Sequence, residues 1–109
     1  MTPQEGNKET TIRLLDAAFN RKDPARVGSL VTERYIQHNP VVPTGREGLV
    51  GALPNFYMVI PTLKWEMKHI WAEGDYVIVH SIYDFGKPTA VVDIFRFNGD
   101  LADEHWDVS

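Results

Sequence analysis

A single carboxylate stands in the middle of an apolar segment near the end of the chain. The segment reads AVVDIFRF from Ala90 to Phe97, with Asp93 at its centre. A carboxylic acid enclosed by apolar groups loses the hydration of its charged form, so it can hold or release a proton near neutral pH. We therefore take Asp93 as the candidate general base.

A base of this kind suits removal of a proton from a carbon beside a carbonyl group, as in an aldol cyclisation or a double-bond shift. The enolate oxygen that forms requires polar donors. His38, Asn39 and a protonated Glu104 are the candidate donors. His80 is the candidate partner of the base. In the structural alternative, His80 and Asp93 only satisfy each other, and the segment around His38 is a turn.

The first half of the chain has the pattern of helices. Apolar residues recur three and four positions apart over 8–23, which predicts an amphipathic helix. An Asp-Pro pair then predicts the start of a short helix over 24–31. The segment 35–45, with two prolines and a glycine, is expected to be extended or looped. The segment 46–61 predicts a third helix, interrupted or ended near Pro54.

The second half has the pattern of strands joined by tight turns. The segments between the turns are rich in Val, Ile, Trp, Tyr and Phe. The turn signals are Glu73-Gly74-Asp75, Phe85-Gly86-Lys87-Pro88 and Asn98-Gly99-Asp100. Helices followed by a four-strand antiparallel meander indicate an α+β fold.

The turn at 85–88 predicts the neighbour of Asp93. A two-residue or a four-residue turn gives the same pairing, and in it His80 lies directly across from Asp93. A two-residue turn at Glu73-Gly74 adds Met67 across from His80. One face of the sheet then gathers large apolar side chains and a few polar ones, and we expect it to be concave and covered by the helices. Its candidate ligand-binding residues are Trp65, Met67, His69, Glu104 and Trp106.

The last turn leaves two alternatives. A two-residue turn at Asn98-Gly99 puts Glu104 across from Asp93 and keeps Trp106 on the apolar face. A three-residue turn would put His105 beside Asp93, with Asp107 on the same face, and would turn Trp106 outward. We prefer the two-residue turn because it keeps the indole on the apolar side, and His105 and Asp107 are then expected to face outward.

The opposite face of the sheet also carries apolar residues, and no helix remains to cover it. An exposed apolar patch of this kind usually marks an interface. The sequence therefore predicts a homodimer that uses Val77, Val79, Val92 and Ile94.

Composition limits the function further. A length of 109 residues predicts one domain over 1–109, and a net charge of −4 gives no footprint for nucleic acid. The absence of cysteine removes thiol nucleophiles and disulfides. The four histidines lack ligand spacing on one helix, so neither a metal nor another cofactor is expected. Without a leader-like segment or a long apolar run, we expect a cytoplasmic location and no membrane partner.

The chain resembles the SnoaL-like polyketide cyclases of the nuclear-transport-factor-two-like superfamily in three motifs: RYIQHNP at 34–40, GREGL at 45–49 and VVDIFRFNGDLADEHWDV at 91–108. The resemblance implies a cone-shaped barrel, in which a curved antiparallel sheet surrounds a pocket and N-terminal helices close one side. It also implies an acid/base aspartate, which matches Asp93, and an assisting histidine on the preceding strand, which matches His80. The connection over 83–89 is short for this family, which favours a smaller substrate or a more open pocket.

Three functional hypotheses follow. The first is a small acid/base enzyme, a cyclase, isomerase or lyase that acts on an apolar carbonyl compound. The second is a non-catalytic, dimeric domain of the same fold that binds a small apolar molecule. The third is an epoxide hydrolase, which needs an Asp-Arg-Asp arrangement in the pocket. Arg96 has the opposite parity to Asp93 on its strand, so the third hypothesis ranks lowest.

Overall fold

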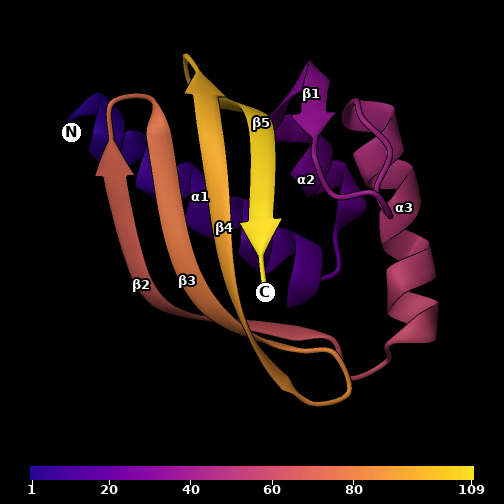
Figure 1. Cartoon of the computed structure of the whole chain (residues 1–109). Helices are drawn as coiled ribbons and strands as arrows, with labels where there is room; N and C mark the ends of the chain where they lie inside the picture. The colour runs from indigo at the N-terminus through magenta and orange to yellow at the C-terminus, as the bar shows by residue number, and fades with distance from the viewer.

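The computed structural model describes residues 1–109 and contains three helices packed on one five-stranded sheet (Figure 1). The elements in chain order are α1 (Pro3–Phe19), α2 (Pro24–Ser29), β1 (Val31–Gln37), α3 (Arg46–Val59), β2 (Lys64–Glu73), β3 (Tyr76–Asp84), β4 (Pro88–Asn98) and β5 (Leu101–Val108). The strand order is β1-β5-β4-β3-β2. Strand β1 pairs parallel with β5, and the other pairs are antiparallel. The α+β class and the C-terminal meander are confirmed, and β1 adds a fifth strand to it.

Side-chain caps mark the starts of α1 and α2. The Thr2 side chain accepts a hydrogen bond from Glu5 N at 3.2 Å, and Asp23 caps α2 as expected by accepting one from Arg26 N at 3.2 Å. Helix α2 ends at Ser29 rather than at 31, because Val31 already pairs with β5. The segment 35–45, expected to be extended or looped, is extended in β1 as far as Gln37 and irregular after it.

Helix α3 continues past Pro54 to Val59. A proline inside a helix removes one backbone hydrogen bond but need not end the helix when tertiary packing supports it. Here Leu53 is buried in the core, and the Tyr57 hydroxyl donates to Ala18 O at 2.6 Å. These contacts hold the second half of α3 against α1, so the expected break near Pro54 does not occur.

The curved sheet holds the core on its inner face. In Figure 1, strands β2, β3 and β4 are long and curved, α1 crosses behind the sheet, and α3 stands at the side of β1 and β5. Alternate residues of β3 and β4 point inward and are buried: Val77, Val79, Ser81, Tyr83, Val91, Asp93, Phe95 and Phe97. On β4 the inward set is the one expected from the sequence.

The β3–β4 turn corrects the predicted neighbour of Asp93. Three residues connect the paired Asp84 and Pro88, and Gly86 at their centre has a φ of +96° and donates its N–H to Asp84 Oδ1 at 2.8 Å. An odd turn shifts the register by one residue and exchanges the two faces of β3. Asp93 therefore lies across from Val79, and the prediction that His80 is its neighbour is wrong.

The β2–β3 pair differs from the sequence prediction for a similar reason. The two-residue turn is Gly74-Asp75, so Glu73 pairs with Tyr76, and a bulge interrupts the ladder between Met67 and His69. Met67 consequently lies across from Ser81 rather than His80, and His69 lies across from His80 on the outer face.

The β4–β5 pair also departs from the preferred register. The turn is Gly99-Asp100, and an additional residue, Asp103, bulges from β5. His105 consequently turns inward and Trp106 outward, which is the outcome of the alternative that was not preferred. The prediction that Glu104 faces Asp93 is wrong, because Glu104 pairs with Arg96 on the outer face.

The outer face of the sheet is apolar but differs in composition from the expected patch. Val77 and Val79 are completely buried in the core and cannot belong to an interface. Ile78, Ile82, Val92 and Ile94 are partly exposed apolar residues in the middle of this side. The homodimer stays a prediction with these residues at its centre. No helix of the structure is long and apolar enough to cross a membrane.

Candidate functional site

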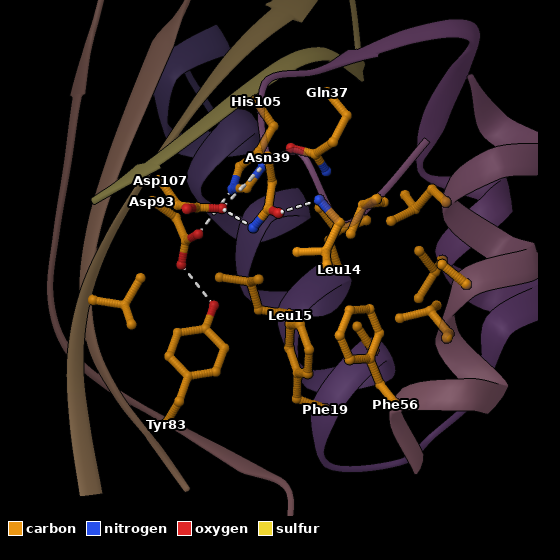
Figure 2. Close-up of a pocket in the computed structure, with 18 of the residues that line it drawn as sticks. Leu14, Leu15, Phe19, Gln37, Asn39, Phe56, Tyr83, Asp93, His105 and Asp107 are labelled. Atoms are coloured by element: carbon orange, nitrogen blue, oxygen red, sulfur yellow. Dashed lines mark hydrogen bonds and ion pairs between the residues drawn. The ribbon is translucent and has the colours of Figure 1, made fainter. Parts of the chain in front are cut away.

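A cavity of about 320 Å³ lies between the inner face of the sheet and the helices. Of the 24 residues that line it, 18 are hydrophobic, so an apolar ligand would fit it. Figure 2 shows the apolar wall formed by Leu15, Phe19 and Phe56. The polar side chains gather at the other end, from β1, the loop that follows it, β4 and β5: Gln37, Asn39, Asp93, His105 and Asp107.

Asp93 is the buried centre of this polar end. It is only 3% exposed, and each of its oxygens accepts one hydrogen bond. The Tyr83 hydroxyl donates to Oδ2 at 2.6 Å, and His105 Nε2 lies 2.8 Å from Oδ1. Burial, and then the neighbouring Asp93 charge, raise the pKa of Tyr83 well above its usual range, so this phenol stays protonated and acts as the donor.

His105 is fixed on three sides. Its ring packs against Phe95 with a centroid distance of 4.6 Å, and Nε2 contacts Asp93. The Gln37 amide contacts Nδ1, and Asp107 Oδ2 lies 3.9 Å from the same nitrogen. Nε2 thus bonds to Asp93 and Nδ1 to Gln37, while Asp107 lies too far away for a direct hydrogen bond to the ring, so the imidazole is positioned to orient Asp93.

Asp107 is the more open of the two carboxylates, with 27% of its side chain exposed. Asn39 donates from Nδ2 to its Oδ2 at 3.2 Å, and the amide is oriented because Asn39 Oδ1 accepts from Val41 N at 3.0 Å. The other oxygen of Asp107 has no hydrogen-bond partner in the protein. Asp107 can therefore contact a bound ligand without breaking an existing bond.

The charge of the cavity is one-sided. Asp93, Asp107 and His105 are its titratable polar residues besides two tyrosines, and neither a lysine nor an arginine lines it. Burial and the Asp93 charge raise the pKa of Tyr35 above its usual range, so this second phenol is also neutral. The cavity consequently favours an uncharged or cationic ligand over an anion.

The same groups offer a limited site for a metal ion. One potential ligand atom each from Asp93, His105 and Asp107 lie within 4.8 Å of one another. His105 Nε2 and Asp93 Oδ1 already bond to each other, however, and Gln37 occupies the remaining ring nitrogen. This donor set fits proton transfer better than metal ligation, since a metal would have to displace those partners.

Two of the residues expected at the site, Asp93 and Asn39, line the cavity. His80 and His69 lie on the outer face, where their rings stack at 5.7 Å. Trp65 is buried in the core, and its indole N–H donates to Ser81 Oγ at 2.8 Å, so it stabilises the fold rather than contacting a ligand.

The remaining expected residues also lie outside the cavity. Met67 is 36% exposed near the β2 bulge. Trp106 stacks on the His38 ring at 4.9 Å on the outer side. Hydrogen bonds from His38 at 2.7 Å and from Arg96 at 2.9 Å hold the pKa of Glu104 below its ordinary value, so it is ionised and cannot be the protonated donor expected from the sequence.

Four polar residues of the site were not expected from the sequence: Gln37, Tyr83, His105 and Asp107. An odd-length turn between β3 and β4 would have placed Tyr83 on the inner face, whereas the inward position of His105 follows from the bulge at Asp103 and not from the two-residue β4–β5 turn. Gln37 gives no such signal, because its strand pairs with β5, almost seventy residues later in the chain.

Comparison with known families and structures gives a consistent result. The family model described as a SnoaL-like domain matches residues 12–105. Comparison with curated proteins gives no match. Among solved structures, a cystatin-fold protein from Novosphingobium aromaticivorans is similar with a TM-score of 0.85 and 23% identity, over 94% of this chain and 97% of that one.

Two further structures point to the same fold. A SnoaL-like protein of unknown function from Burkholderia thailandensis has a TM-score of 0.84 and 17% identity, over 99% of this chain and 98% of that one. IdmH, a candidate polyketide cyclase from Streptomyces antibioticus, has a TM-score of 0.79 and 19% identity, over 94% and 90%. At these identities the likeness establishes the fold and not the reaction.

Proposed function

The chain belongs to the SnoaL-like domain family, and we propose that it is a small, cofactor-independent acid/base enzyme. Its substrate would be an apolar carbonyl compound, and its reaction an aldol-type cyclisation or an isomerisation. The observation that carries the proposal is the Asp93 carboxylate, held by Tyr83 and His105 at the polar end of an apolar cavity. Named neighbours such as IdmH support this class of reaction but carry no residue roles to this chain.

Asp93 is the proposed general base. It would take a proton from the carbon beside the carbonyl group, and His105 would replace His80 as the partner that orients it. The free N–H of the Asn39 amide would donate to the enolate oxygen, joined by the Tyr83 hydroxyl when Asp93 becomes protonated.

The substrate class follows from the size and charge of the cavity. About 320 Å³ is near the lower end of the roughly 300–1,000 Å³ found for ligand pockets. A carboxylate on the ligand would face Asp93 and Asp107 in a cavity that no lysine or arginine lines. A neutral ketone or ester with one or two rings therefore fits best.

Proton exchange tests this function without knowledge of the natural substrate. The protein would be mixed with 2-decalone in heavy water, and the loss of the protons beside the carbonyl followed by NMR. We expect exchange faster than in buffer and faster than with heat-denatured protein. A ketone that raises the melting temperature without any faster exchange would contradict the enzymatic proposal.

That contradiction would leave the non-catalytic binding domain as the function. One observation favours this alternative: both oxygens of Asp93 already have protein partners, as in a self-satisfied structural group. No observation favours the epoxide hydrolase, because Arg96 points to the outer face and no arginine lines the cavity.

A further inference from the structure

Two consecutive residues of β5, Asp103 and Glu104, point away from the cavity. Phe97 of β4 pairs with Ala102, and the preceding Arg96 pairs with Glu104, so Asp103 is an extra residue in the strand. A bulge of this kind resets the alternation of side chains and is common beside functional sites, where it re-aims a side chain.

The bulge decides what faces the cavity. Ala102 is completely buried and faces inward. In a regular strand beyond it, Glu104 and Trp106 would also face inward, and His105 would face outward. With Asp103 as the extra residue, His105 and Asp107 face the cavity instead.

One arginine on the outer face of the sheet, Arg96, binds both residues of the bulge. Arg96 donates from Nε to Glu104 Oε1 at 2.9 Å and from Nη2 to Asp103 Oδ2 at 2.8 Å. The planar guanidinium has its donors in a fixed fork, so it can hold two carboxylates in one relative position. Without this cation the two neighbouring carboxylates would repel each other on the same side of the strand.

The other contacts of this network reach one residue of the bulge each: His38 Nε2 lies 2.7 Å from Glu104 Oε2, and the remaining partners bind Asp103. The Asp103 side chain is completely buried and also accepts from Thr32 Oγ1 at 2.6 Å and from Arg34 at 3.0 and 2.6 Å. Arg34 makes two bonds to Asp103 and none to Glu104, so it anchors the strand without linking the two residues of the bulge.

We propose that Arg96 is a positioning residue that holds the β5 bulge and thereby keeps His105 and Asp107 in the cavity. The proposal rests on the proposed function only in treating those two residues as working groups of the site. The alternative state of β5 is a strand without the bulge, in which Glu104 and Trp106 face inward. The position of the His105 ring can be measured without a substrate, so a failure here is distinguishable from a failure of the proposed enzyme.

The test compares Arg96→Met with Arg34→Met, two substitutions that each remove two hydrogen bonds to the outer carboxylates. NMR cross-peaks between the His105 and Phe95 rings, 4.6 Å apart, report the inward position. We expect these cross-peaks to be lost in Arg96→Met and kept in Arg34→Met. Their retention in Arg96→Met, or their equal loss in both variants, would overturn the proposal.

A rescue variant covers the case in which Arg96→Met does not fold. Deletion of Asp103 removes the extra residue, so Glu104 faces outward and His105 inward in a regular strand. Arg96→Met combined with this deletion should fold and show the His105–Phe95 cross-peaks. A double variant that is unfolded, or folded without the cross-peaks, would contradict the role of Arg96 in holding a bulge.

Discussion

His105 Nε2 lies 2.8 Å from Asp93 Oδ1, although the two residues are not directly paired in the sheet. Asp93 pairs with Asp107, and His105 pairs with Phe95, so the imidazole reaches Asp93 diagonally across β4 and β5. One face of two adjacent strands thereby carries a carboxylate, an imidazole and a second carboxylate in succession. The candidate site is a product of this pairing and of the bulge that precedes it.

The first prediction concerns the base. Asp93→Asn should lower the exchange rate of a bound ketone by roughly 10²-fold or more, because a positioned base contributes at least that much. The amide can accept from only one of Tyr83 and His105 with its single oxygen, so stability should also fall, by about 1–3 kcal/mol. The exchange rate per folded molecule is the deciding measurement, with the melting temperature recorded beside it.

Two further variants control this experiment. Asp100→Asn, in the exposed turn between β4 and β5, should leave both rate and stability unchanged. Asp107→Asn should reduce the rate less than Asp93→Asn does. If only Asp107→Asn abolished exchange, the base would be Asp107, and the assignment of Asp93 would be wrong.

The second prediction concerns acid stability. Hydrogen bonds from Arg34, Thr32 and Arg96 hold the pKa of Asp103 well below its ordinary value. A carboxylate with a lowered folded pKa contributes stability that is complete above its unfolded pKa, near 4, and is lost as the pH falls toward the folded pKa. Asp103→Asn should therefore destabilise the protein by about 1–3 kcal/mol at pH 7.

The difference between wild type and Asp103→Asn should shrink as the pH falls below about 4, because the wild type then gives up the same contribution. Urea unfolding at a series of pH values measures this difference. A constant difference across the acid range would show that ionisation of Asp103 does not contribute.

The third prediction is the homodimer on the outer face of the sheet. Ile78, Ile82 and Ile94 are partly exposed there, and nothing in the chain covers them. Ile94→Glu should convert a dimer into a monomer in sedimentation equilibrium, since a buried unpaired charge is costly at an interface. Met58→Glu on the exposed side of α3 is the control and should leave the dimer intact. A wild-type protein that stays monomeric at high micromolar concentration would refute the prediction.

The sequence predicts the fold well because its signals are local. The Asp-Pro cap of α2, the glycine turns and the inward position of Asp93 on β4 depend on residues close in the chain. Which side chain faces Asp93 depends on a single residue of turn length, and each shift of one exchanges the two faces of a strand. The odd turn at 85–87 thus moved His80 outward.

The bulge at Asp103 could not be predicted from local sequence patterns. Its partners Thr32 and Arg34 come from β1, whose pairing with β5 is set by the tertiary fold. The alternation of apolar residues in β5 favoured an inward Trp106, whereas the structure has Asp103 and Glu104 bound to Arg96 and Trp106 turned outward. The candidate site could therefore be placed on β4 from the sequence, but its second half on β5 could not.

The last prediction concerns the charge of the ligand. Cyclohexyl methyl ketone and cyclohexanecarboxylate share a ring and differ in charge at the group that would lie beside Asp107. The cavity offers two carboxylates and no lysine or arginine, so the carboxylate should bind more weakly than the ketone by roughly tenfold or more. Asp107→Asn should narrow this gap by improving binding of the carboxylate, while binding of the ketone changes little. Calorimetric titration of both ligands into both proteins measures the four affinities. Tighter binding of the carboxylate by the wild type would rule out the proposed orientation, with the polar group of the ligand at the Asp93–His105–Asp107 end.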